Sequence, residues 1–207
     1  LQGDWSSDVC SSDLVVDYIS VHTYPFHDTY YNPSFWTGVM VDEKTSNDNR
    51  IKNAMLRSSN YAIKQFESVK NYIKSIGINK PIHIGETGWA SISSDYYGQN
   101  GTRAADEYKQ YLYFNNMMEY GKKNNISIFY FSAFDEPWKD YNNPNGSENH
   151  FGLFTVEGKA KYVMWKNVDN GLLKGIGRNN IDVLKTYSGE RKNMMIDVLT
   201  PNRRNKW

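Results

Sequence analysis

Hydrophobic and polar positions follow two periods along the chain from residue 15 onward. β-branched and aromatic residues fill positions 15–24 and Pro25 follows them, which predicts a buried strand. A polar, aromatic-rich loop is expected up to about Arg50. Apolar residues then recur at spacings of three and four, which predicts an amphipathic helix with Gly77 at its C-terminal cap. The apolar positions of this helix are Ala62, Phe66, Val69, Ile73 and Ile76.

The same alternation of strand and helix occurs twice more. Positions 81–85 predict a second short strand, and Thr102 is expected to cap a helix that ends near residues 121–123. Residues 126–133 are apolar on both faces, as expected of a central parallel strand, and a short helix is expected over 160–168. One face of the helix that follows Thr102 carries Ala105, Tyr108, Leu112 and Asn115.

Strands that alternate with crossover helices predict an α/β fold with a parallel sheet and helices outside it. We interpret residues 15–172 as the last part of an eightfold α/β barrel, the TIM barrel, with about three-eighths of its units present. A complete barrel of this kind needs about 250 residues. This chain has 207.

Two end segments do not follow this alternation. Residues 1–14 repeat the tripeptide Ser-Ser-Asp, and we interpret them as a non-native or disordered leader, with an ordinary polar loop as the alternative. Near the other end, positions 181–187 and 194–199 are typical of two strands around a turn at 188–189. Residues 173–207 are therefore expected to begin a small β-rich C-terminal segment.

Composition and charge exclude several classes of function. The 24 basic and 23 acidic residues are scattered in both signs, and the net charge of +1 gives no electrostatic case for nucleic acid or a membrane surface. No apolar run approaches the roughly 20 residues of a membrane-spanning helix. Cys10 is the only cysteine, which excludes an internal disulfide and a thiolate metal cage. The 16 Tyr, 9 Phe and 6 Trp suit both a core and stacking on sugar faces.

Carboxylates lie at the ends of the predicted strands. In an α/β barrel the active site lies at the C-terminal ends of the strands, so Glu86 and Glu136 are expected at one rim. A carboxylate there can capture an oxocarbenium-like carbon while a second carboxylic acid protonates the leaving oxygen, which is the chemistry of glycosidic bond cleavage. The alternatives are a solvated surface charge for Glu86 and an ion pair with Lys139 for Glu136. Asp135 is expected to point the other way and to be structural.

The strand ends also carry side chains that suit contacts to a sugar. His83 and Glu86 stand three apart on a strand and therefore face opposite sides, so no metal site is expected there. The candidate substrate contacts are His22, Tyr24, Trp89, Phe134 and Trp138.

Four motifs occur in the order and approximate spacing of one known family. They are V-H-T-Y-P-F at 21–26, I-G-E-T-G-W-A-S at 84–91, F-D-E-P-W-K at 134–139 and F-G-L-F at 151–154. With these motifs, residues 15–165 resemble glycoside hydrolase family 17, the β-1,3-glucanases and related glucanosyltransferases. The resemblance implies an eightfold α/β barrel in which the three strands here are the sixth, seventh and eighth.

The resemblance also implies roles for single residues. Glu86 matches the nucleophile of a retaining, double-displacement mechanism, and Glu136 and Lys139 match a supporting carboxylate–lysine pair. Tyr24 and Trp89 match aromatic residues that line the substrate cleft. The family's general acid lies at the end of the fourth strand, which no segment here matches. We therefore expect this chain by itself not to hydrolyse glucan at an appreciable rate.

The sequence thus predicts a retaining glycoside hydrolase or transglycosylase that acts on β-1,3-glucan. No cofactor or metal is expected, because two carboxylates suffice for this chemistry. The expected partner is a β-glucan, with no nucleic acid and no membrane, and the complete protein is expected to be a monomer. An extracytoplasmic location is favoured because polymeric glucan is met outside the cytoplasm. The alternatives are a non-catalytic β-glucan-binding barrel and a barrel hydrolase such as a β-mannanase, which would lack the F-G-L-F motif.

Overall fold

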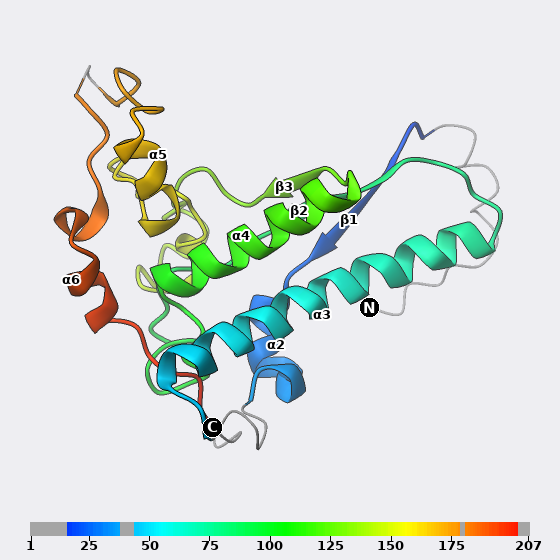
Figure 1. The fold of residues 1–207 in the computed structure, drawn as a ribbon, viewed down its shortest axis with the longest axis horizontal. Coiled ribbons are helices and arrows are strands. Elements are labelled where there is room, and N and C mark those ends of the chain that lie inside the picture. The colour runs from blue at the N-terminus through cyan, green and yellow to red at the C-terminus, as the bar shows by residue number, and fades with distance from the viewer. Residues whose placement is uncertain (1–15, 38–43, 179–180, 203–207) are drawn as a thin grey trace.

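Three parallel strands form the sheet of the computed structural model, which describes residues 16–37, 44–178 and 181–202 (Figure 1). The strands β1 (Ile19–Thr23), β2 (Ile82–Thr87) and β3 (Ile128–Tyr130) lie side by side in that order. The prediction of adjacent parallel strands is confirmed. β1 and β3 are shorter than predicted, whereas β2 extends two residues further and includes Glu86.

Two long helices connect the strands and lie on the same side of the sheet (Figure 1). Helix α3 (Asn47–Ser75) follows β1 and packs against β1 and α4, and helix α4 (Glu107–Asn124) follows β2 and packs against β3. Each strand–helix–strand unit is therefore the crossover that an α/β barrel repeats. The described residues form the partial barrel that the sequence predicted. None of the described helices is long and apolar enough to cross a membrane.

The ends of the two helices show where the sequence pattern succeeds and fails. Gly77 follows α3 with φ of +83°, the left-handed conformation expected of a capping glycine. The predicted cap at Thr102 is wrong, because α4 begins after Asp106, whose carboxylate accepts a hydrogen bond from the Lys109 N–H at 2.8 Å. Thr102 is buried instead, with its Oγ1 3.1 Å from Oγ1 of Thr29.

The segment after β1 is not the loop that the sequence predicted. It contains helix α2 (Pro25–Tyr31) and the 3₁₀ turn η1 (Pro33–Phe35). Proline has no amide hydrogen and suits the first turn of a helix, so Pro25 both ends the strand and begins α2. Phe26 and Thr29 of α2 are buried, and this helix therefore packs part of the β1 loop onto the core.

The C-terminal segment differs from its prediction as well. The strands predicted at 181–187 and 194–199 are wrong. Residues 181–184 belong to no strand and Lys185 makes only an isolated bridge to Ala160, and the 3₁₀ turn η6 (Thr186–Gly189) and helix α6 (Arg191–Ile196) follow. A short apolar run such as 194–199 is compatible with either a strand or a helix. Here its first residues belong to a helix, which buries Met194 against the hydrophobic core. The boundary proposed at residue 172 stays a prediction, and residues 1–14 lie outside the described residues. Shorter elements complete the chain: η3 (Ser147–Asn149), η4 (Tyr162–Met164) and α5 (Trp165–Asp169).

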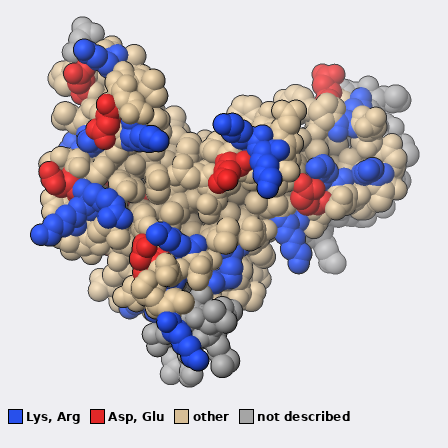
Figure 2. Space-filling model, in the orientation of Figure 1, with Lys and Arg blue, Asp and Glu red and all other residues tan. Residues whose placement is uncertain are grey.

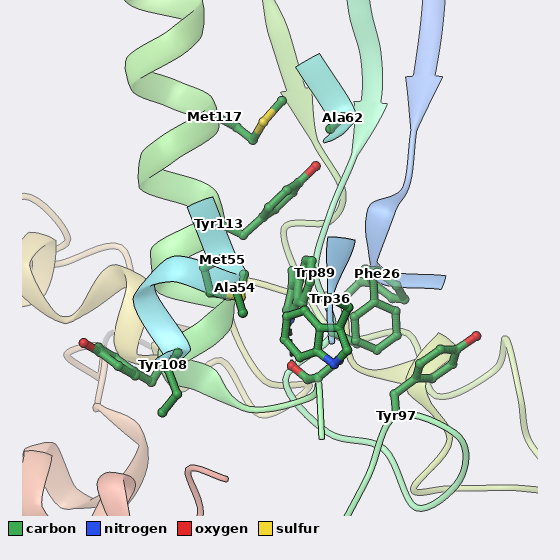
Figure 3. Packing of buried hydrophobic residues seen from close by; sticks show 14 of the residues in the cluster. Phe26, Trp36, Ala54, Met55, Ala62, Trp89, Tyr97, Tyr108, Tyr113 and Met117 are labelled. Atoms are coloured by element: carbon green, nitrogen blue, oxygen red, sulfur yellow. Dashed lines mark hydrogen bonds between the residues drawn. The ribbon is translucent and has the colours of Figure 1, made fainter. Parts of the chain in front are cut away.

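An aromatic core lies at the carboxyl ends of the strands (Figure 3). Trp89 is fully buried, with its ring 5.3 Å from that of Phe26, 5.8 Å from that of Trp36 and 5.1 Å from that of Tyr113. Its indole N–H donates to the carbonyl of Ala104 at 2.9 Å. The loops after β1 and β2 are therefore fixed against each other directly beside the predicted site.

Charge is evenly mixed over the visible surface. On the face shown in Figure 2, basic and acidic side chains are interspersed and wide areas between them are uncharged. This pattern agrees with the net charge of +1 and supplies no single-sign patch on that face.

Candidate active site

Glu86 lies in β2, next to its carboxyl end, and points to the face of the sheet opposite the long helices. Successive side chains of a strand point to opposite faces, so Glu86 and its neighbour Thr87 lie on different sides of the sheet. Thr87 is fully buried, with Oγ1 donating to the carbonyl of Thr23 at 2.7 Å and lying 2.6 Å from the hydroxyl of Tyr113. The Glu86 side chain keeps 31% of its surface exposed. A carboxylate at this position can meet a ligand at the rim.

Two side chains from the end of β1 and just beyond it hold the Glu86 carboxylate. His22 Nδ1 lies 2.9 Å from Glu86 Oε2. The Tyr24 hydroxyl forms a hydrogen bond with Glu86. Burial, together with the charge of Glu86, raises the pKa of Tyr24 well above its ordinary value. The phenol therefore stays protonated and donates to the carboxylate, which orients Glu86.

Glu136 and Lys139 follow β3 and lie beside this group. Lys139 Nζ is 3.5 Å from Glu136 Oε2 and 4.2 Å from the ring centroid of Phe131. The Phe131 ring in turn meets the Tyr24 ring edge-on, with centroids 6.5 Å apart. Glu86 and Glu136 are thus joined through Tyr24, Phe131 and Lys139 at one rim.

A glycine allows the ends of β2 and β3 to approach this closely. A Cβ at Gly88 would lie 2.3 Å from the carbonyl oxygen of Phe131, so any larger residue would push the strand ends apart. The Glu136 N–H donates to the carbonyl of Asn149 at 3.0 Å, which fixes the turn that carries the carboxylate. Glu136 Oε2 is buried and makes no hydrogen bond within the described residues, so the ammonium of Lys139 is its main stabilising charge.

Asp135 points away from Glu136, as predicted. Its Oδ1 accepts hydrogen bonds from Lys161 Nζ at 2.6 Å and from the Gly152 N–H at 3.0 Å, and both Asp135 and Lys161 are buried. Burial lowers the pKa of Lys161, and the charge of Asp135 opposes that shift. This buried pair therefore has a structural role, as was expected of Asp135.

Trp89 is a correction to the predicted site. Its side chain has no exposed surface and lies in the aromatic core, so it supports the end of β2 and does not line the cleft. Phe134 and Trp138 are exposed, at 49% and 67% of their surface. Their role as substrate contacts stays a prediction.

Glu148 and His27 were missed by sequence reasoning. His27 Nε2 lies 3.6 Å from Glu148 Oε1, and the charge of Glu148 also contributes to the raised pKa of Tyr24. Burial lowers the pKa of His27. Glu148 stands in a polar loop that looks ordinary, and its place three residues before the F-G-L-F motif was the only signal. The structure therefore places a third glutamate near Tyr24.

Among the described ranges, no group of three or more His, Cys, Asp or Glu side chains lies close enough together to hold a metal ion.

Comparison with known proteins gives one family and two informative relatives. The model of the family described as glycosyl hydrolases family 17 matches residues 48–165. A curated protein from Arthroderma benhamiae, described as a glucan 1,3-beta-glucosidase, is 37% identical over 93 residues, which is 42% of this chain and 28% of that protein. The crystal structure of an endo-laminarinase from Formosa is 53% identical with a TM-score of 0.89, covering 93% of this chain and 49% of that one. The chain therefore spans about half the length of the solved relative, and its match covers less than a third of the curated one.

Proposed function

Since this chain belongs to glycosyl hydrolases family 17, we propose that it carries the nucleophile of a retaining glycoside hydrolase or transglycosylase acting on β-1,3-glucan. The names of the two relatives, an endo-laminarinase and a glucan 1,3-beta-glucosidase, support this substrate class. Family membership also sets aside the β-mannanase alternative. The observation that carries the proposal is Glu86 at the end of β2, held by His22 and Tyr24 at a partly exposed rim.

In the proposed mechanism the Glu86 carboxylate attacks the anomeric carbon of a bound glucosyl unit. The bond to the leaving sugar oxygen breaks as the bond to Glu86 forms, and the leaving oxygen takes a proton from a general acid. Water, or a sugar hydroxyl in a transglycosylase, then displaces Glu86 from the anomeric carbon. The hydrogen bond from Tyr24 orients the attacking carboxylate. This hydrogen bond weakens as the carboxylate loses its negative charge on bonding to the anomeric carbon.

Glu136 and Lys139 support this step and do not protonate the leaving group. Lys139 lies between Glu136 and the ring of Phe131, so its positive charge is shared with a carboxylate and an aromatic face. A carboxylate held against an ammonium and beside the nucleophile suits support of the attack better than protonation of the leaving oxygen. We therefore assign the general acid to a strand that no segment of this chain matches.

The test is hydrolysis of laminarin by the complete gene product that carries this chain. Glu86→Ala should lower kcat by at least about 10³-fold, because both covalent capture and charge stabilisation are lost. Azide should restore turnover of an aryl β-glucoside by Glu86→Ala, since azide can take the place of the missing carboxylate. The matched control is Glu119→Ala, which removes an exposed glutamate of α4 and should leave kcat unchanged.

Two results would contradict the proposal. Full activity of Glu86→Ala would remove the nucleophile assignment. Absence of laminarin hydrolysis by the unmodified complete protein, with retained glucan binding, would favour the non-catalytic β-glucan-binding barrel. Hydrolysis by the 207-residue chain alone would leave Glu86 in place but would overturn the assignment of the general acid to another strand.

A further inference from the structure

A groove lined by tyrosine rings lies next to the candidate active site but outside it. It has a volume of about 570 Å³, within the roughly 300–1,000 Å³ of ordinary small-ligand pockets. We call it the tyrosine groove, and its lining residues are Tyr30, Ser94, Asp95, Tyr96, Asn100 and Gly101. It lies between the loop after β1 and the loop after β2, both at the carboxyl end of the sheet.

We propose that the tyrosine groove is a distal subsite that binds a glucosyl unit of the same β-1,3-glucan chain whose cleavage is proposed at Glu86. The inference rests on the proposed function for its substrate class. Its residues are separate from those that hold Glu86.

The chemistry of the groove suits a neutral, hydroxyl-rich ring. Tyr30 and Tyr96 stack with centroids 4.4 Å apart and planes 27° from parallel, which covers one face of Tyr96 and leaves 53% of its surface exposed. The free face is a flat apolar platform, and flat rings of this kind match the apolar face of a pyranose. Asp95 and Asn100 stand at the edge and offer acceptors and an amide donor for hydroxyl groups.

The groove is held in shape before any ligand arrives. Thr29, next to Tyr30, lies 3.1 Å from Thr102, and the Trp36 indole donates to the Thr102 carbonyl at 2.8 Å. The Thr102 N–H donates to the carbonyl of Tyr96 at 2.8 Å, which connects this buried contact directly to the platform. Rigid side chains lose little conformational freedom on binding, so a preformed groove binds more tightly than a mobile one.

The edge of the groove is fixed in the same way. Asn143 Nδ2 donates to Asp95 Oδ2 at 2.6 Å, which orients the carboxylate. A Cβ at Gly101 would lie 2.0 Å from the carbonyl oxygen of Tyr96, so glycine is needed for the turn that closes the groove.

An unbroken row of aromatic side chains joins the groove to the site around Glu86. The ring of Tyr24, whose hydroxyl bonds to Glu86, lies 5.9 Å from His27. The ring centroids of His27 and Tyr97 are 5.7 Å apart, and the Tyr97 hydroxyl is 3.3 Å from His27 Nδ1. Tyr97 lies 6.5 Å from Tyr30, which stacks on the platform. Tyr97 is buried, so these contacts fix the spacing between the groove and the site, as two subsites of one polymer require.

The test compares the complete gene product with Tyr96→Ala in binding and in turnover. Native electrophoresis through a laminarin-containing gel, in a Glu86→Gln background that leaves the polymer intact, should show retardation that Tyr96→Ala weakens about tenfold, as expected for loss of one aromatic anchor. In the active background, KM for laminarin should rise about tenfold while kcat and the turnover of a short aryl β-laminaribioside stay unchanged. Tyr96→Phe should behave as the unmodified protein, because it keeps the ring.

Tyr72→Ala is the matched control, since Tyr72 is a tyrosine of α3 with 57% of its surface exposed, far from the strand ends. If Tyr96→Ala fails to fold, Asn100→Ala at the exposed edge serves instead and should show a smaller rise in KM. Unchanged retardation in Tyr96→Ala, or an equal loss in Tyr72→Ala, would overturn the distal subsite. Retardation that depends on Tyr96 without any laminarin hydrolysis would refute the proposed activity and leave the subsite standing.

Discussion

Replacing Lys161 with alanine should destabilise the fold more than any surface charge change. The Lys161 ammonium is buried and has three partners: Asp135 Oδ1 at 2.6 Å, Ser91 Oγ at 2.7 Å and the His150 carbonyl at 3.2 Å. Removing it leaves the Asp135 carboxylate, with 9% of its side chain exposed, without its cation. The remaining hydrogen-bond donor to that carboxylate is the Gly152 N–H, and His150 Nδ1 lies 3.5 Å from its other oxygen.

The expected loss is about 3–5 kcal/mol, the usual cost of removing one partner of a buried ion pair. For a chain of this length that corresponds to a fall in Tm of roughly 10 °C. The double variant Asp135→Asn with Lys161→Met should be more stable than Lys161→Ala, because it leaves no buried charge unpaired. Urea unfolding followed by circular dichroism measures each difference.

The matched control is Lys52→Ala, which breaks an exposed pair with Asp48 on the surface of α3. Both side chains are about half exposed, so the expected change is at most about 0.5 kcal/mol. Equal effects of Lys161→Ala and Lys52→Ala would refute the reasoning, since burial would then add nothing to the pair.

Further predictions follow from the same contacts. Tyr24→Phe in the complete protein should lower kcat about ten- to hundredfold without lowering Tm, because one hydrogen bond to a charged group is lost; an unchanged kcat would show that Tyr24 does not orient Glu86. Trp89→Ala should lower stability by about 3–5 kcal/mol as a core truncation, whereas Trp138→Ala should raise KM and leave Tm unchanged; the opposite pattern would restore Trp89 to the cleft. Burial raises the pKa of Glu107, so its ionisation destabilises the fold. That cost is complete above the folded pKa, shrinks as the pH falls through the folded pKa and is gone below the unfolded pKa. Glu107→Gln should therefore gain more stability over the unmodified protein at pH 7 than at pH 4, measured by Tm at both values, and an equal gain at both would contradict this assignment.

The strands and long helices were predictable because each depends on local patterning. β-branched runs ended by Pro25 or by Gly85 with Glu86 predict strands. The stripe from Ala62 to Ile76 predicts the second half of α3, but only Ala62 and Phe66 of that stripe are buried, and the rest of the buried face lies nearer the start of the helix. Helix α2 was missed because a proline suits both the end of a strand and the first turn of a helix. Only the burial of Phe26 decides between them.

The remaining errors come from contacts between residues distant in sequence. Thr102 and Asp106 are both good helix caps, but the hydroxyl of Thr102 is in contact with that of Thr29 from helix α2. Trp89 follows the nucleophile directly, yet its ring turns into the core against Phe26. Glu148 reaches the neighbourhood of Tyr24 through the folding of a polar loop, which no periodicity records.

The candidate site itself was predictable from the strand ends because barrels place function there. Glu86, Glu136 and Lys139 fall on predicted strand ends in the sequence, and in the structure the rings of Tyr24 and Phe131 connect Glu86 to the Glu136–Lys139 pair. The bonds that hold Glu86, from His22 and Tyr24, required the register between β1 and β2, in which His22 stands opposite Glu86.

The central claim is that Glu86 forms a covalent bond to the anomeric carbon, and a trapping experiment measures it directly. The complete protein is treated with a 2-deoxy-2-fluoro-β-laminaribiosyl fluoride, in which the fluorine at C2 slows hydrolysis of the glycosyl-enzyme while fluoride leaves without needing a general acid. Peptide mass mapping should then place the added disaccharide on Glu86, within the peptide that carries Gly85 and Thr87. A label on Glu136, Glu148 or any other residue, or slow turnover without a label, would contradict the account.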